Sequence, residues 1–270
     1  MHRSIGTALV IALFGGIAAA QTTISKSNSS DDDFTWTGKM AAGSWLRVRN
    51  LNGEINVERA SGDVAEVTGE KRWRRGDPKE VHFVVVKDGG NITICALWGD
   101  ESSCDARGVD YHRRHHDDWG DDNDVRVKFT VKLPKGVKVD VGTVNGALDV
   151  SGAQSEVQAS TVNGRVDVAT SSGPVSAHTV NGSVSVRMDA LSGSDDLDFS
   201  TVNGSVSVEV PANFSGEIEM ETVNGSLTSD FPLTISGRVN PKHLRATIGS
   251  GGRRIELKTV NGSIELKKGS

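Results

Sequence analysis

The stretch Thr179-Val180-Asn181-Gly182-Ser183-Val184-Ser185-Val186 decides the fold, because its first four residues recur through the second half of the chain. Thr-Val-Asn-Gly begins at Thr143, Thr161, Thr179, Thr201, Thr222 and Thr259, and the variant Asn50-Leu51-Asn52-Gly53 lies near the start. Each copy is followed by alternating apolar residues. Internal repeats of this length are typical of stacked architectures, and the 37-residue gap before the last copy predicts a degenerate unit near Thr247-Ile248-Gly249.

Two all-β architectures fit this pattern. Asn-Gly between alternating strands predicts a hairpin through a type I′ turn, and hence an antiparallel meander or sandwich. The other architecture is a β-solenoid, in which each repeat of about 18–22 residues is one coil with Asn-Gly at a corner. In a hairpin, strict alternation places the residue before Asn outside, yet it is apolar in all seven copies: Leu51, Val144, Val162, Val180, Val202, Val223 and Val260.

We therefore favour the solenoid, with this apolar residue turned inward. The asparagines of successive coils should then lie one strand spacing apart, about 4.8 Å, and form a side-chain ladder. The turn residues, to which we assign a structural role, are Asn52, Gly53, Asn145, Gly146, Asn163, Gly164, Asn181, Gly182, Asn203, Gly204, Asn224, Gly225, Asn261 and Gly262. Four of these turns continue with Ser and match the N-glycosylation pattern, but turn chemistry explains all seven.

The composition supports an all-β protein that does not bind nucleic acid. The chain has 270 residues, 36% of them apolar, and 31 glycines. Abundant Val, Thr, Ser and Gly favour strands and turns. The formal net charge of −5 leaves no strongly basic face.

The N-terminus predicts export. Residues 1–20 combine weak basic character, an apolar run and Ala18-Ala19-Ala20, as in a signal peptide; a retained membrane anchor is the alternative. Residues 21–43 are expected to be a flexible leader. A β region at 44–134 and a repeat solenoid at 135–268, continuous with it, should follow, without a membrane span in the mature chain.

Cys95 and Cys104 are the only cysteines, and in an oxidising compartment we expect them to form a local disulfide; two free buried thiols are the alternative. They border or lie in a polar segment at 97–124, which we interpret as a surface loop. Its weak candidate metal ligands are His112, His115, His116, Asp117, Asp118 and Asp121. Arg113 and Arg114 oppose a cation there, so a solvated loop is the competing interpretation.

Little in the sequence supports catalysis. The nucleophile-elbow, P-loop and zinc-protease motifs are missing, and the acidic residues of the repeats are scattered. We predict no catalytic residues and no cofactor. Lys71-Arg72-Trp73-Arg74-Arg75 is a small basic and aromatic patch, interpreted as an exposed strand end.

The repeated Thr-Val-Asn-Gly-Ser-Val units, the opening Asn50–Val57 and the strand Val125–Pro134 resemble the bacterial "putative adhesin" family, a β-strand-repeat domain of unknown function. The resemblance covers residues 44–268 and carries no catalytic residues. It implies an exported protein, periplasmic or at the cell surface, that acts as an adhesin-like scaffold towards an envelope polymer or a protein partner. Alternatives are an envelope-stress regulatory component that acts through a protein partner and a polysaccharide-active enzyme.

Overall fold

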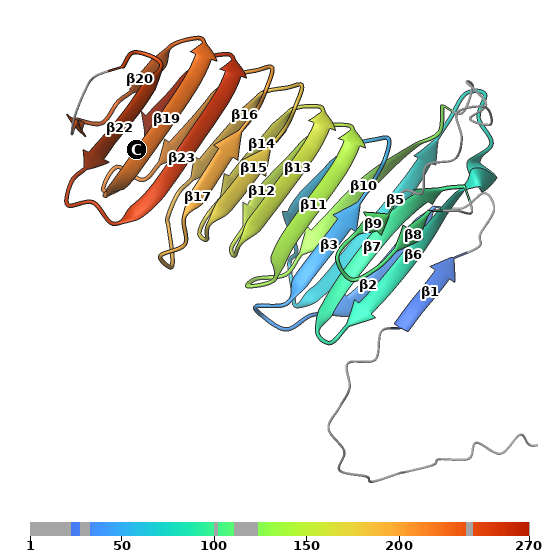
Figure 1. Ribbon diagram of the computed structural model, residues 1–270. Coiled ribbons are helices and arrows are strands. Elements are labelled where there is room, and N and C mark those ends of the chain that lie inside the picture. The colour runs from blue at the N-terminus through green and yellow to red at the C-terminus, as the bar shows by residue number, and fades with distance from the viewer. Residues whose placement is uncertain (1–22, 28–32, 100–101, 111–123, 236–239, 270) are drawn as a thin grey trace, which may run out of the picture.

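The computed structural model describes residues 23–27, 33–99, 102–110, 124–235 and 240–269, and these fold into two long sheets that form the two layers of an elongated molecule (Figure 1). Sheet A has 12 strands in the described residues. They are, in spatial order, β1 (Thr23–Ser27), β6 (Val81–Asp88), β7 (Asn91–Trp98), β3 (Trp45–Arg49), β11 (Lys138–Asn145), β13 (Val157–Asn163), β15 (Val175–His178), β17 (Leu197–Ser200), β23 (Arg253–Asn261), β19 (Gly216–Asn224), β22 (His243–Ile248) and β21 (Thr234–Ile235).

Sheet B has 10 strands within the same described ranges. They are β2 (Phe34–Lys39), β5 (Val64–Arg72), β10 (Arg126–Leu133), β4 (Ile55–Arg59), β12 (Leu148–Ala153), β14 (Val166–Thr170), β16 (Val184–Met188), β18 (Val206–Val210), β24 (Ile264–Lys268) and β20 (Leu227–Ser229). The small hairpin of β8 (Ser103–Cys104) and β9 (Val109–Asp110) and the 3₁₀ turn η1 (Pro78–Glu80) complete the description.

The repeats stack as coils, each giving one strand to each sheet. β11 pairs in parallel with β13 in sheet A, and β12 pairs in parallel with β14 in sheet B. The pairing places Val139 beside Val157 and Leu148 beside Val166, so equivalent residues of neighbouring coils are in register. The sheets do not close into a barrel. The fold is therefore the predicted β-solenoid and not a meander of hairpins.

Alternate residues of both sheets fill the space between the layers. Val139, Val141, Leu148 and Val150 are at most 2% exposed, and the same positions are buried in the other coils except on β20, at the end of the stack. Burial of one such aliphatic side chain contributes about 1.5–3 kcal/mol. The repeat alternation therefore accounts for a long, thin core.

The predicted asparagine ladder runs along one edge of the solenoid. The side-chain Nδ2 of each asparagine donates to Oδ1 of the asparagine in the preceding coil, at 2.8 Å in every step. The spatial order is Asn52, Asn145, Asn163, Asn181, Asn203, Asn261 and Asn224. The ladder gives the asparagine side-chain amides of the stacked corners hydrogen-bond partners in one another.

The expectation that the valine before each asparagine turns inward is wrong. Val180 and Val202 are each 39% exposed, whereas Thr179 and Thr201 beside them are buried. Sheet A keeps its alternation through the Thr-Val pair, and the chain turns only at Asn-Gly. Each buried threonine donates its hydroxyl to the glycine carbonyl of the neighbouring coil, as from Thr179 Oγ1 to Gly164 O at 2.9 Å.

The outward valines instead cover one another along the edge. Val223, at the end of the row, is 58% exposed, against 40% for Val260, its neighbour inside the row. The stacking of valines therefore explains much of their recurrence, since cross-strand pairs of β-branched residues stabilise a sheet.

The coils do not follow one another in sequence order. β23 and β24, the last coil of the chain, lie between β17–β18 and β19–β20. The degenerate unit expected near Thr247 is not a coil, because β22 returns antiparallel to β19. The terminal coil of the stack therefore precedes, in the sequence, the coil that lies beside it.

Antiparallel strands close the N-terminal end of the solenoid. β10 pairs in parallel with β4 and antiparallel with β5, and β5 pairs antiparallel with β2. Phe83 packs between Phe34 and Phe129, with ring centroids 4.7 and 5.9 Å apart. The strands β1 and β2 fall inside residues 21–43, so regular structure begins earlier than the expected flexible leader allows. Residues 1–20 lie outside the described residues.

Candidate functional site

The outer face of sheet A presents continuous rows of polar side chains. Strand register aligns one row across five neighbouring strands: Arg47, Asp140, Gln158, Ser176 and Asp198. A parallel row, two residues further along each strand, is Arg49, Ser160, His178 and Ser200, and it is interrupted at Gly142 on β11. We call the outer face from β3 to β17 the polar face. It is open, and its middle is formed by small or planar side chains.

A basic and aromatic group forms one end of the polar face. The Trp45 ring has the Arg47 guanidinium 5.3 Å and the Lys138 ammonium 5.2 Å from its centroid. Lys138 also pairs with Glu156 at 2.9 Å. Such cation–π contacts restrict the motion of long basic side chains, and the carboxylates keep the net charge of this end small.

His178 lies at the centre of a hydroxyl cluster further along the polar face. Its Nδ1 is 2.8 Å from Ser200 Oγ and its Nε2 is 2.9 Å from Ser176 Oγ. Asp198 is 4.0 Å from Nε2. A neutral imidazole donates through one nitrogen and accepts through the other. The cluster is therefore a donor and acceptor array, and nothing in the sequence singled it out because serine is so common in the repeats.

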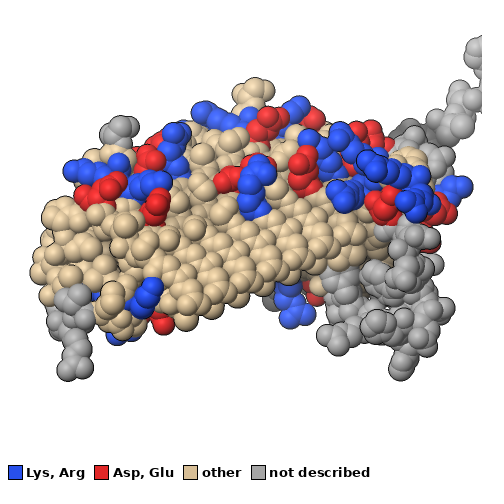
Figure 2. Space-filling view, turned by 90° about the horizontal axis from the view of Figure 1, so that it is seen from above, with Lys and Arg blue, Asp and Glu red and all other residues tan. Residues whose placement is uncertain are grey.

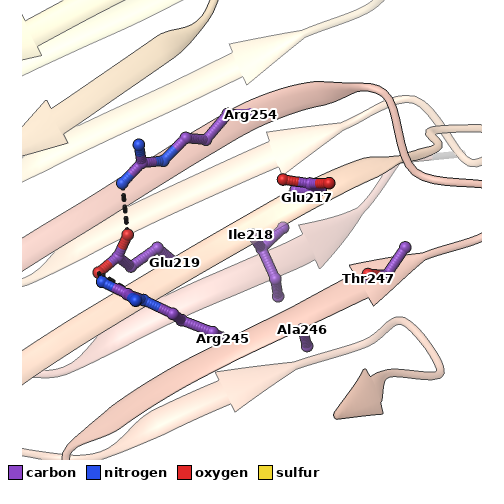
Figure 3. A pocket seen from close by; sticks show the side chains of 7 residues that line it. All are labelled: Glu217, Ile218, Glu219, Arg245, Ala246, Thr247 and Arg254. Atoms are coloured by element: carbon purple, nitrogen blue, oxygen red, sulfur yellow. Dashed lines mark hydrogen bonds and ion pairs between the residues drawn. The ribbon is translucent and has the colours of Figure 1, made fainter. Parts of the chain in front are cut away.

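A pocket of about 450 Å³ lies near the C-terminal end of sheet A, between Glu217, Glu219, Arg245, Thr247 and Arg254 (Figure 3). Arg245 and Arg254 converge on opposite oxygens of Glu219, and Arg245 Nη2 lies 2.7 Å from Oε1. Burial alone would raise the pKa of Glu219, but the hydrogen bonds from both arginines outweigh it and the pKa is lowered. Glu219 is therefore an ionised group already neutralised by its neighbours.

One possible metal-ligand group occurs among the described residues. One ligand atom from each of Glu219, Glu221 and His243 lies within 4.8 Å of the others. A cation there would compete with both arginines for the Glu219 carboxylate, so the electrostatics disfavour it. The sequence candidates His112, His115, His116, Asp117, Asp118 and Asp121 all lie outside the described residues.

The disulfide between Cys95 and Cys104 is formed, as predicted. It joins β7 to β8 and lies in a small apolar cluster with Val84, Val86 and Leu97 on the outer side of sheet A. The predicted surface segment 97–124 thus contains a short hairpin pinned to the sheet. Gly108 of this hairpin lies near the Arg49 side chain, at the border of the polar face.

The side chains of the basic and aromatic sequence patch, Lys71 to Arg75, do not form one surface patch in the structure. Lys71 is buried and its Nζ donates to Pro78 O, while Arg72 pairs with Glu70. Asp124 accepts backbone N–H bonds from Arg74, Arg75 and Gly76 at 3.0–3.1 Å. These bonds lower the pKa of Asp124 to about 2. Residues 71–76 therefore form a fixed strand end, and Asp124 acts as its anchor.

The family to which the chain is similar agrees with this architecture. The sequence profile of the Toastrack DUF4097 family matches residues 46–267. The chain belongs to the Toastrack family. This family is a domain of unknown function, so membership adds no catalytic or binding residue. No curated protein matches the chain.

Solved structures similar to this Toastrack chain are distant. A "putative cell adhesion protein" from Clostridium sporogenes shares 8% identity at a TM-score of 0.44, covering 88% of this chain and 100% of the other. A "putative adhesin" from Bacteroides fragilis shares 11% identity at a TM-score of 0.36, covering 88% and 98%. Among the described residues of the Toastrack chain, no helix has the length and apolar character needed to cross a membrane.

Proposed function

We propose that this Toastrack chain is an exported, non-catalytic, adhesin-like scaffold that binds a neutral, hydroxyl-rich polymer of the envelope along the polar face. One observation carries the proposal. Gln158, Ser176, His178 and Ser200 form an open array of donors and acceptors, in register across adjacent strands. Polysaccharide hydroxyls both donate and accept, so such an array matches them without requiring charge.

The shape of the polar face fits an extended ligand better than a small molecule. Small-molecule sites are concave and bury most of the ligand, whereas the polar face is an open surface across successive strands. The charged groups at its Trp45 end are paired with each other. Export is proposed from the N-terminal sequence alone, and N-terminal sequencing of the secreted or periplasmic protein, expected to begin at Gln21, tests it.

Binding of soluble envelope polysaccharides to the mature protein, measured by isothermal titration, tests the polar face. His178→Ala and Gln158→Ala should each weaken binding by about tenfold, since each removes hydrogen bonds of ordinary net strength. Ser207→Ala, on the outer side of sheet B, is the control and should bind normally. Equal binding by wild type and both polar-face variants would refute the proposal.

The valine edge supports a second candidate, an envelope-stress component that acts through a protein partner. The edge at which β11, β13, β23 and β19 end carries the exposed valines and the asparagine ladder. In Figure 2 it is a regular uncharged band with charged side chains gathered along one border. Uncharged surfaces with exposed apolar rows are typical of protein contacts. Replacing Val180 and Val202 by Thr, followed by co-purification from envelope fractions, distinguishes the two candidates. Loss of a co-purifying protein supports binding at the valine edge, whereas a scaffold that binds polysaccharide through the polar face would be unaffected.

A further inference from the structure

The seven Asn-Gly turns are chemically alike but are not equally protected. In six of them the glycine N–H donates to the asparagine carbonyl of the next coil, at 2.8–3.0 Å. The donors are Gly53, Gly146, Gly164, Gly182, Gly204 and Gly262. The asparagine of each of these six turns also accepts a ladder bond at Oδ1. In these six turns, both the glycine backbone and the asparagine side chain are therefore hydrogen-bonded to the next coil.

Asn224-Gly225 is the exception, because it belongs to the last coil of the stack. Asn224 Nδ2 still donates to Asn261 Oδ1. Within the described residues, however, no donor reaches Asn224 Oδ1 and no acceptor receives the Gly225 N–H. Among the described strands sheet B ends at β20, immediately after this turn, so no further described coil stacks on Asn224 and Gly225.

We infer that Asn224 is a site of spontaneous deamidation, selected by its place at the open end of the ladder. The Gly225 backbone nitrogen loses its proton and attacks Asn224 Cγ. The new N–C bond forms as the Cγ–Nδ2 bond breaks, and Nδ2 leaves as ammonia with the proton. Water then opens the cyclic imide at either carbonyl, giving aspartate or isoaspartate.

Two features of the turn favour this step at 224. Among the described residues the Gly225 N–H has no acceptor, so its deprotonation breaks no hydrogen bond there, although the Asn224 carbonyl of the same peptide unit accepts from Gly262 N at 2.9 Å. Lys242 Nζ donates to Gly225 O and so places a positive charge on the residue whose nitrogen must become negative. A nearby cation favours deprotonation. In the other turns the same nitrogen must first leave its acceptor in the next coil.

The product would alter the end of the ladder. An aspartate at 224 has no N–H to donate to Asn261 Oδ1, so two oxygens would face each other where the 2.8 Å bond now lies. An isoaspartate would also lengthen the backbone between β19 and β20. Deamidation would therefore loosen the terminal coil and leave the interior coils intact.

The sequence supplies its own controls. The pentapeptide Thr-Val-Asn-Gly-Ser occurs at 179–183, 201–205, 222–226 and 259–263, so Asn181, Asn203 and Asn261 have the same immediate neighbours as Asn224. The folded full-length mature protein is incubated at mildly alkaline pH. Cleavage after glutamate separates Asn224 from Asn203, and fragmentation mass spectrometry then distinguishes asparagine, aspartate and isoaspartate at each position.

Aspartate and isoaspartate should accumulate at 224 about tenfold faster than at the three controls, the factor that one hydrogen bond of ordinary net strength represents. In denaturing urea the four sites should react at similar rates, which shows that position in the stack causes the difference. Equal rates at the four sites of the folded protein would overturn the inference, as would faster reaction at Asn203 than at Asn224.

Discussion

Replacing Gly164 by alanine tests whether close contact between coils holds the solenoid together. A Cβ at Gly164 would lie 1.9 Å from Gly146 O, whereas real Cβ contacts are essentially never shorter than 3.0 Å. The neighbouring corner would have to move by about 1.1 Å, the difference between these two distances. The clash is with backbone, so no side-chain rotation relieves it.

Such a movement would break the bonds that cross this corner. They run from Gly146 N to Asn163 O, from Thr161 Oγ1 to Gly146 O, and from Asn163 Nδ2 to Asn145 Oδ1, at 3.0, 3.0 and 2.8 Å. Lengthened by about 1 Å, each exceeds hydrogen-bonding distance. Three bonds at about 1 kcal/mol each, with about 1–3 kcal/mol of overpacking, give a loss of roughly 4–6 kcal/mol.

Urea unfolding followed by circular dichroism measures this loss. A loss of this size is a large part of the ~5–15 kcal/mol that stabilises a typical domain. Gly62→Ala is the matched control, because nothing lies within 4 Å of a Cβ at Gly62, and its unfolding free energy should change by less than about 1 kcal/mol. If Gly164→Ala also unfolds within about 1 kcal/mol of the wild type, the coils are not held at this contact and the reasoning fails.

Three other measurements examine separate contacts. Thr179→Val keeps the shape of the side chain but removes its hydroxyl bond to Gly164 O, and should lower the free energy of unfolding by about 1–2 kcal/mol in urea titrations; no change would show that the buried hydroxyl is dispensable. Replacing Cys95 and Cys104 by serine should cost about 2–3 kcal/mol, and reductant should destabilise only the wild type. The Asp124 carboxylate has its pKa lowered from 3.8 to about 2, so its stabilisation is complete above about pH 4 and is lost as the pH falls through 2. The stability difference between wild type and Asp124→Asn, followed by urea midpoints from pH 6 to 2, should therefore shrink over that interval, and a constant difference would contradict it.

The turns predict the solenoid correctly, but the side chain before each asparagine does not point where they predict. Burial does not explain why an apolar residue recurs before each asparagine, because Val180 is exposed and Thr179 is buried. A β-branched residue in a stacked row gains contacts from its copies in neighbouring coils, so its recurrence does not require the core. The stacking of Asn163 on Asn181 follows directly from equal turns in register.

The polar face could not be predicted, because its residues are ordinary when read singly. Ser176, His178 and Ser200 come from two different coils, and only the register of β15 with β17 brings them together. The same is true of Glu219, Arg245 and Arg254, which come from three strands. Sites built across neighbouring strands leave no local motif in the sequence.

The order of the coils shows the limit of a repeat pattern most clearly. Thr259 donates to Gly204 O at 2.8 Å and Thr222 donates to Gly262 O at 2.9 Å, the same bond that joins coils adjacent in sequence. Because every coil offers its neighbour the same groups, the repeats alone do not favour sequential stacking over insertion. The connections must decide the order.

Two features of the connections favour insertion of the last coil. β22 turns back along β19 and covers the outer edge of the coil formed by β19 and β20 in sheet A. Arg253, at the start of β23, donates Nη2 to Ser192 O at 2.8 Å and so fastens the returning chain beside the segment that leads into β17. Because β22 occupies the outer edge of β19, β23 pairs with the other edge of β19 and with β17. The repeats therefore specify the shape of each coil, and the non-repeating segment between them specifies where the last coil goes.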